Sequence, residues 1–476
     1  MKKLLLLLTV LFNTAISYGQ KYGNVWQFSD QVGLDFNNCT PVVISGGVLG
    51  FEGCSSIADS NGQLLFYTNS EKVWNRQHSV MSNGNLISMG STLSQVIIIP
   101  KPLSTSLYYI ITTKIQAQGN LSLQYHIVDM NLNGGLGDVL SKNNIMSTLN
   151  ITEQICATYH NNGDDIWLMT HEYGTSNFLA YLVTSSGIST IPVISNVGPA
   201  HVSCNSNTNA RGEIKFSPNG NKIAFNGNGV GGNDPSNILC VFDFDNTTGI
   251  VSNPLNLPYS RGDYGLSFSP DNSKLYGTTW KALNFGLTDY NYLYQFDLSS
   301  GNASTIINSK QIIDSLQFGG IYGTLKIGPD GKIYVRYINS SYLGVINSPN
   351  LAGAACGYVK NGFYIGSQTY QYGLNNYIEY TQYCNSTGLS IYNEKNKGIS
   401  VFPNPFSSQT EIQSDFFLHN ASLTIFNYFG ESVLEFHNIC GQTFTFNRAY
   451  LANGIYFIRV TDENKTLAIE KLILTD

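Results

Sequence analysis

Two copies of an arginine–glycine–acid triplet are the residues of this sequence best placed for recognition chemistry. Arg211-Gly-Glu213 and Arg261-Gly-Asp263 each lie just before an apolar run that is typical of the first strand of a repeat. If the repeats are the blades of a propeller, this position lies on the face where the channel opens, which is the usual binding face, and two blades bring an arginine and an acidic residue together there. We therefore predict a binding site at Arg211, Glu213, Arg261 and Asp263. The alternative interpretation is a salt bridge between neighbouring repeats, which would be structural.

Signatures of catalysis and of metal binding are weaker. The turn Asp59-Ser-Asn-Gly62 is similar to the aspartate box of sialidases, but its spacing is one residue too long, and such enzymes also need converging arginines. His171 lacks partners at the spacing of a zinc site. Calcium could bind oxygens of Asp243, Asp245 and Asn246, although their order is not that of an EF-hand. We predict no catalytic residue, no metal and no cofactor, with calcium as the open alternative.

The two triplets precede hairpins of one recurring kind. In Glu213–Phe225 an apolar run is followed by Ser-Pro-Asn-Gly and by a second apolar run, which predicts two strands joined by a β-turn. Similar hairpins have their turns near residues 61, 103, 162, 219, 271 and 330. These spacings of about 42 to 59 residues, with a weaker second hairpin in each interval, predict an all-β chain folded as a β-propeller with four-stranded blades.

The number of blades depends on the two ends of this region. Six inner hairpins are clear, but residues 25–45 add a seventh outer hairpin that needs an inner partner. The stretch between Gly362–Ile365 and Tyr377–Tyr380 could supply it, and the ring would then close within one blade and leave no open sheet edge. We therefore predict seven blades over residues 22–382, with six blades as the alternative.

The composition favours an all-β chain, and the N-terminal residues predict export. Charged residues make up 12% of the chain, against about 25% in a typical soluble domain. The formal net charge of -6 gives no reason to expect a nucleic acid as partner. Lys2-Lys3, the apolar run Leu4–Phe12 and the small residues that follow predict a signal peptide over residues 1–19. No later stretch is long and apolar enough to predict a transmembrane segment.

Eight cysteines fit a compartment in which disulfides form. None of them belongs to a Cys-x-x-Cys pair, so the sequence gives no support for a zinc site. We predict one local disulfide between Cys39 and Cys54, and a lone buried thiol at Cys440.

The sequence pattern changes after a polar linker at residues 383–398. Residues 399–476 contain six or seven short alternating strands, which predict a small Ig-like β-sandwich. This part resembles the type A C-terminal sorting domain of the Bacteroidetes type IX secretion system, and the matching residues include Pro403, Asn404, Pro405, Gly430, Gly454 and Tyr456. The resemblance implies export across the outer membrane. It also implies two partners, the secretion machinery and its sortase.

The larger part resembles uncharacterised surface propellers of Bacteroidetes, at Trp26–Phe28, Gly33–Phe36, Asp59–Tyr67 and Val73–Asn75. That resemblance implies no activity. We predict a secreted or outer-membrane-attached protein whose propeller binds an extracellular ligand, either a glycan, a protein or a matrix component. Two alternatives remain, a polysaccharide hydrolase or lyase with its site in the propeller channel, and a structural component of the surface layer.

Overall fold

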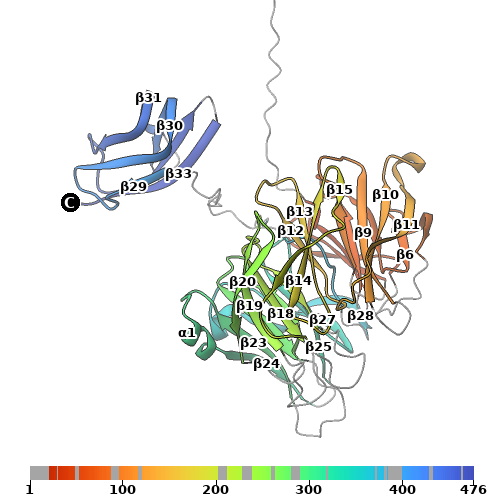
Figure 1. The fold of residues 1–476 in the computed structure, drawn as a ribbon. Helices are drawn as coiled ribbons and strands as arrows, with labels where there is room; N and C mark the ends of the chain where they lie inside the picture. Colours follow the sequence, from red (N-terminus) through yellow and green to blue (C-terminus); the bar gives the residue numbers. More distant parts are fainter. Residues whose placement is uncertain are drawn as a thin grey trace, which may run out of the picture. The chain divides into compact units, whose positions relative to one another are not determined.

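The structure is a computed structural model of the chain. It describes residues 21–28, 31–48, 53–86, 96–115, 121–201, 212–227, 238–258, 263–279, 290–317, 320–369, 373–379, 383, 399–427, 432–462 and 465–476. The chain divides into two compact units, residues 1–387 and residues 388–476. Figure 1 labels the strands of both units.

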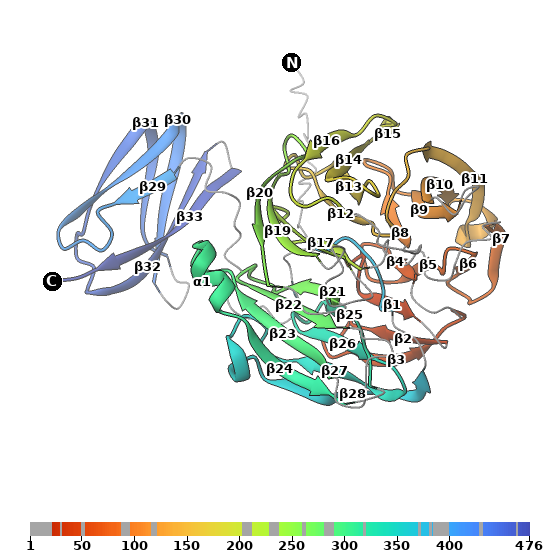
Figure 2. The same cartoon turned by 60° about the horizontal axis from the view of Figure 1, so that its bottom comes forward.

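The first unit is built of antiparallel sheets that radiate from a central axis, as the blades of a β-propeller do (Figure 2). Six hairpins lie nearest the axis, and their turns fall where the sequence predicts them. These hairpins are β4 (Ser55–Ala58) with β5 (Leu64–Thr68), β8 (Val96–Pro100) with β9 (Leu107–Ile115), β12 (Cys156–Tyr159) with β13 (Ile166–His171), β17 (Ile214–Phe216) with β18 (Lys222–Gly227), β21 (Asp263–Phe268) with β22 (Lys274–Thr279), and β25 (Tyr322–Ile327) with β26 (Ile333–Tyr337).

Each of these hairpins is extended outward by further strands. They are β6 (Lys72–Asn75), β7 (Val80–Asn85), β10 (Leu121–Asp129), β11 (Asp138–Ser147), β14 (Asn177–Thr184), β15 (Gly187–Ile188), β16 (Val193–Asn196), β19 (Ile238–Asp245), β20 (Ile250–Asn256), β23 (Asn291–Asp297), β24 (Gln311–Leu316), β27 (Ser340–Ile346) and β28 (Tyr358–Thr369). Strands β4–β7 and β8–β11 are linked into one eight-stranded sheet by a single parallel pair, Ser82 with Asp138. Helix α1 (Ala303–Asn308) and the 3₁₀ turns η2 (Asn133–Gly135) and η4 (Gly353–Cys356) lie in connections.

A separate three-stranded sheet consists of β1 (Val25–Phe28), β2 (Val32–Asp35) and β3 (Val42–Ser45). Its side chains share a core with the last sheet, because Trp26 and Phe36 pack against Tyr334 of β26. The first and last sheets of the unit are therefore neighbours. One part of the predicted closure is wrong, since Gly362–Ile365 belongs to β28, where it pairs with β27 rather than completing the first sheet.

Residues 373–379 reach the axis from the far end of the unit. The backbone carbonyl of Asn376 accepts a hydrogen bond from Ser55 Oγ at 2.6 Å. Its side-chain amide donates to the carbonyls of Val96 at 3.1 Å and Ile155 at 3.4 Å. The segment thus contacts three neighbouring sheets at their axial edge, and it does so without forming a strand of its own.

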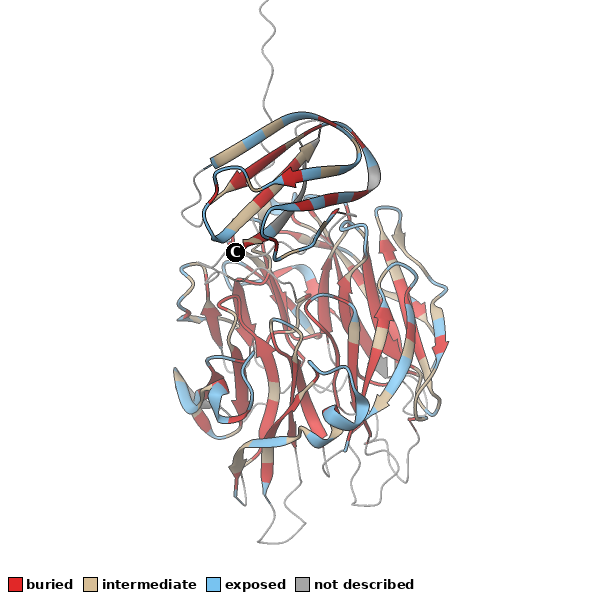
Figure 3. Ribbon diagram, turned by 90° about the vertical axis from the view of Figure 1, so that its left-hand side faces the viewer, coloured by how far each residue is buried: buried red, intermediate tan, exposed pale blue. Residues whose placement is uncertain are grey.

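Burial follows the radial arrangement, and the strands of the first unit are mostly buried along their length (Figure 3). Strands β4, β13, β17, β21, β22 and β26 are buried at every residue. These strands contain polar side chains such as Ser55, Lys215 and Arg336 as well as apolar ones, and all of them are buried. The predicted disulfide is wrong, since Cys54 is a free thiol buried in the core between the first and last sheets.

The second unit is one five-stranded sheet in the order β29-β30-β32-β33, with β31 also paired to β30. Its strands are β29 (Ile399–Phe402), β30 (Gln409–Phe426), β31 (Ser432–Asn447), β32 (Gly454–Asp462) and β33 (Lys465–Leu474). Five strands, two of them long, replace the six or seven short ones expected for this part. Shifts of register within β30 let its first half pair with β29 and its second half with β32. Cys440 is exposed rather than buried.

Candidate functional site

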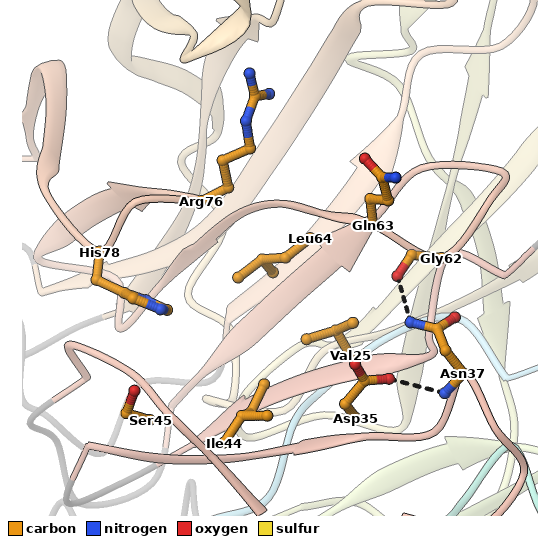
Figure 4. Close-up of a pocket in the computed structure, with 10 residues that line it drawn as sticks. All are labelled: Val25, Asp35, Asn37, Ile44, Ser45, Gly62, Gln63, Leu64, Arg76 and His78. Atoms are coloured by element: carbon orange, nitrogen blue, oxygen red, sulfur yellow. Dashed lines mark hydrogen bonds between the residues drawn. The ribbon is translucent and has the colours of Figure 1, made fainter. Parts of the chain in front are cut away.

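A cavity of about 560 Å³ lies between the sheet β1–β3 and the sheet β4–β7 (Figure 4). Its volume is within the range of small-molecule sites, roughly 300–1,000 Å³. Apolar side chains meet polar ones in its lining, which consists of Val25, Asp35, Asn37, Ile44, Ser45, Gly62, Gln63, Leu64, Arg76 and His78. Several of these residues fall within or beside the stretches that resemble surface propellers.

A hydrogen bond between Asn37 and Gly62 joins the two walls of the cavity. The side-chain amide of Asn37, just after β2, donates to the carbonyl of Gly62 in the β4–β5 turn at 2.7 Å. Gly62 has a φ of 87°, and a Cβ added there would lie 1.9 Å from Asn37 Oδ1. The carboxylate of Asp35 accepts a hydrogen bond from the backbone N–H of Asn37 at 2.8 Å, which orients the same turn. This contact therefore requires glycine at position 62.

The turn between β6 and β7 carries Arg76 and His78. The side-chain oxygen of Asn75 accepts from the backbone N–H groups of Gln77 at 2.9 Å and Ser79 at 3.3 Å, and so shapes the turn. The guanidinium of Arg76 donates to the carbonyl of Gly135 in η2. His78 takes a positive φ of 60°. In Figure 4 the ring of His78 points toward Ile44 and Ser45, while the side chain of Arg76 extends away from these residues at the outer end of the cavity.

The ring of His78 is held from the core. Its Nδ1 lies 2.9 Å from the hydroxyl of Tyr67, and that oxygen also accepts a hydrogen bond from the backbone N–H of Gly47 at 2.9 Å. Tyr67 is fully buried and stacks on Trp74 with ring centres 5.5 Å apart. Burial raises the pKa of Tyr67 to about 12, so its hydroxyl keeps its proton at neutral pH.

The axis of the first unit holds a second cluster, made of two buried ion pairs. Lys215 lies 3.2 Å from Glu213, and Lys326 lies 2.9 Å from Glu379. The ammonium of Lys326 also donates to the carbonyl of Tyr377 at 3.1 Å. Burial lowers the pKa of Lys326 to about 8, against the attraction of Glu379. These contacts fasten residues 373–379 at the axis.

The predicted site residues Glu213 and Asp263 are buried and have internal partners. Glu213 accepts a hydrogen bond from the backbone N–H of Leu266 in the next sheet at 2.7 Å, and Asp263 accepts one from the hydroxyl of Tyr294 at 2.9 Å. Glu213 thus connects two neighbouring sheets, as the structural alternative expects, although its cation is Lys215 of its own strand. Arg211 and Arg261 lie outside the described residues. Binding at these four residues stays a prediction.

The oxygens considered for calcium are engaged by protein groups. Asp243 lies 2.8 Å from Lys222 and accepts from Asn253 at 2.8 Å, and Asp245 accepts from the backbone N–H of Thr247 at 2.9 Å. Within the described ranges, histidine, cysteine and acidic side chains form no cluster of three that could hold a metal. Calcium stays a prediction. His171 is buried in an aromatic cluster, where its ring stacks on Phe225.

In the second unit, Asn404 links two stretches that the resemblance singled out. Its side-chain oxygen accepts from the backbone N–H of Ile473 at 2.8 Å, and its amide donates to the carbonyl of Lys471. The carbonyl of Pro403 accepts from Thr410 at 2.6 Å. Asn404 therefore uses its side chain to form the hydrogen bonds that a neighbouring strand would otherwise make with Lys471 and Ile473 of β33.

The other sorting residues lie near the same edge of the chain's last sheet. Gly454 begins β32 with a φ of 155°, and the hydroxyl of Tyr456 donates to the carbonyl of Ala452 at 3.0 Å. Pro405 precedes Phe406, whose backbone N–H donates to the carbonyl of Ile473 at 3.0 Å. Gly430 is outside the part of the chain that the structure describes.

Residues 400–475 match the family described as the secretion system C-terminal sorting domain. The second unit is a type IX secretion sorting domain. A chain with this sorting domain is exported by the type IX system, and the protein is therefore secreted or attached to the outer-membrane surface. In the part of the chain that is described, no helix is both long and apolar enough for a membrane span.

No curated protein matches the chain in sequence. Solved structures with a similar fold share about a tenth of their residues with it. A functionally unknown protein from Desulfotomaculum acetoxidans is 11% identical with a TM-score of 0.38, covering 74% of this chain and 98% of that one. A protein from Lactobacillus plantarum is 10% identical with a TM-score of 0.37, covering 86% and 95%. The β-propeller domain of Cps50 (Swd1) from Myceliophteria thermophila is 10% identical with a TM-score of 0.36, covering 66% and 93%.

The sequence analysis did not predict the cavity between the sheets β1–β3 and β4–β7. Its polar residues come from two sheets and are spread from Asp35 to His78, with no motif spacing among them. The one available signal is that the stretches that resemble surface propellers gather within residues 26–75. Because that resemblance implies no activity, it predicts no site there.

Proposed function

We propose that the exported first unit is a binding module and that its ligand is an extracellular saccharide held in the cavity between β1–β3 and β4–β7. The observation that carries the proposal is the mixed lining of this cavity. Ile44 and Leu64 offer apolar surface, which suits the C–H face of a sugar ring. Asp35, Ser45 and His78 stand around that surface with hydrogen-bonding groups, which suit its hydroxyls.

A hydrolase or lyase with its site in the channel has less support. Most glycosidases need two carboxyl groups on either side of the scissile bond, about 5–9.5 Å apart. The described carboxylates at the axis, Glu213 and Glu379, are each bound to a lysine. Residues 373–379 also occupy the axis and contact the sheets around it. Binding without cleavage is therefore the favoured function.

We also infer that the first unit has seven blades, and the observations that support this count are the sheet order and the position of residues 373–379. The seven blades would be β1–β3, β4–β7, β8–β11, β12–β16, β17–β20, β21–β24 and β25–β28. The segment 373–379 would stand where the first blade lacks an inner strand, since Tyr377 contacts Trp26 of β1 with ring centres 6.1 Å apart. For the sorting domain, we propose an Ig-like sandwich whose partners are the secretion machinery and its sortase.

A glycan array probed with the secreted full-length protein tests this function, together with an assay for polysaccharide cleavage. We expect saturable binding to a saccharide without turnover, and loss of binding in the variant His78→Asn. Asparagine tolerates the positive φ at this position and keeps an acceptor near Tyr67, but its shorter side chain has no donor at the position of Nε2. Cleavage of a bound glycan would favour the enzyme, and absence of any glycan binding would leave the surface-layer role.

A further inference from the structure

The two walls of the cavity differ in charge, which bears on the class of saccharide that would bind there. Arg76 and His78 stand on the wall formed by the β6–β7 turn, and Asp35 stands on the opposite wall (Figure 4). We propose, on the basis of the function above, that the ligand is an anionic saccharide. Its carboxylate or sulfate group would lie toward Arg76 and His78, and its hydroxyls toward Asp35.

The contacts of His78 fix which of its ring nitrogens can donate to a ligand. The hydroxyl of Tyr67 accepts a hydrogen bond from Gly47 and has one proton to donate. Nδ1 of His78 lies 2.9 Å from it and can accept that proton. A neutral histidine that accepts at Nδ1 carries its hydrogen on Nε2. His78 therefore presents an N–H donor on the side of the ring away from Tyr67, which is the side that faces the cavity.

Arg76 is an arginine at the rim whose position is fixed by the protein. Of the two described arginines of the first unit, Arg336 is fully buried and Arg76 is exposed. One nitrogen of Arg76 is held by the carbonyl of Gly135, which comes from the neighbouring sheet. The remaining N–H groups lie in the same plane and suit the paired oxygens of a carboxylate or sulfate. Because the side chain is held before binding, little of its freedom is lost when the ligand arrives.

Asp35 would set the direction of the ligand. Its carboxylate is partly exposed and accepts from the backbone N–H of Asn37, which leaves acceptor capacity for sugar hydroxyls. It would also repel a second anionic group placed on its side of the cavity. The chain as a whole carries a net charge of -6, so attraction of an anion must come from local donors such as Arg76 and His78.

The test is calorimetric titration of the secreted full-length protein with three probes of similar size: an oligogalacturonate, a sulfated disaccharide and maltotriose. The variants are Arg76→Gln and His78→Asn. Gln77→Ala is the matched control, because Gln77 lies in the same exposed turn and uses only its backbone N–H to hold that turn. Thermal unfolding of each variant checks that it folds.

We expect at least one of the two anionic probes to bind more tightly than maltotriose. Arg76→Gln and His78→Asn should each weaken that binding about tenfold or more, as for loss of a charge-assisted hydrogen bond, and Gln77→Ala should leave it unchanged. A comparison of the galacturonate with the sulfated probe tells which anionic group the site prefers.

If maltotriose binds as tightly as the anionic probes and His78→Asn abolishes its binding, the proposal of an anionic ligand is wrong and the saccharide site stands. Anion binding unaffected by both variants would overturn the assignment of Arg76 and His78. No binding of any probe, and none on the glycan array, would overturn both proposals.

Discussion

The hydroxyl of Tyr67 lies 2.9 Å from Nδ1 of His78, and it is the same hydroxyl that accepts the backbone N–H of Gly47. A fully buried side chain thus orients an exposed one at the edge of the cavity. The stacked pair of Tyr67 and Trp74 makes this support rigid. The proposed binding site therefore depends on core residues as well as on those that line the cavity.

Substitution Tyr67→Phe removes the hydroxyl and leaves Gly47 N–H and His78 Nδ1 without their partner. We expect the free energy of unfolding to fall by about 1–2 kcal/mol, measured by urea denaturation. Affinity for the saccharide should also fall, because the ring is no longer fixed. In a His78→Asn background the effect of Tyr67→Phe on affinity should disappear, as coupled residues require. Two affinity losses that simply add would contradict this coupling.

Alanine at position 62 tests the contact between the two cavity walls. Gly62→Ala must bear a positive φ and a clash with Asn37 Oδ1 at 1.9 Å. Gly134→Ala is the control, since Gly134 has a φ of 64° and no atom within 4 Å of the added Cβ. We expect the control to lose about 1 kcal/mol of stability, and Gly62→Ala to lose more and to bind saccharide more weakly. Equal stability losses would show that the contact is unimportant.

Breaking the axial ion pair should destabilise the first unit. Lys326→Met leaves the carboxyl group of Glu379 without this cation in surroundings where its side chain is only 8% exposed. We expect a loss of about 3–5 kcal/mol in the free energy of unfolding, as for a buried charge without its partner. The double variant Lys326→Met/Glu379→Leu should recover most of that loss. If the double variant is as unstable as the single one, the loss in the free energy of unfolding comes from changed packing and not from the unpaired charge.

Stability should fall in mild acid because of His126. Burial, with Lys142 nearby, lowers the pKa of His126 to about 4, whereas an unfolded histidine titrates near 6.5. Between these pH values the unfolded state binds more protons, so the free energy of unfolding falls as the pH falls. The contribution is of the order of 3 kcal/mol at pH 4. His126→Gln cannot titrate, so its stability should change less between pH 6.5 and 4. Parallel pH curves for the two proteins would contradict this.

The contact of Asn404 with β33 should matter for export. Asn404→Ala removes both hydrogen bonds to the last strand, and we expect it to destabilise the sorting domain by about 1–2 kcal/mol. The fraction of protein that reaches the cell surface or the medium should fall. Gln413→Ala, at an exposed position of β30, is the control and should export normally. Normal export of Asn404→Ala would show that this clamp is dispensable.

The repeats were predictable because residues close together in the sequence determine their turns. Ser217-Pro-Asn-Gly220 forms its turn with Gly220 N–H donating to the carbonyl of Ser217 at 2.8 Å, and the side chain of Ser217 contacts Asn219 within the same turn. The sorting domain was predictable for a different reason, because short stretches that include Asn404 and Lys471 resemble those of a known family.

The closure and the site depended on contacts between distant residues. Ser55 and Asn376 meet at the axis although 321 positions separate them. The sequence places Glu213 beside Arg211, whereas its contacts with Lys215 and with the backbone of Leu266 in the next sheet become visible only in the fold. The ring of His78 faces a cavity whose other wall begins at Val25, and hydrophobic periodicity carries no information about such a pairing.

The most direct test of the proposed function is an experimental structure of the secreted protein with a bound oligosaccharide. We predict the sugar between Leu64 and His78, with its anionic group on the side of Arg76 and its hydroxyls near Asp35. A sugar bound at the axis or on another face, with the cavity between β1–β3 and β4–β7 empty of it, would contradict this account.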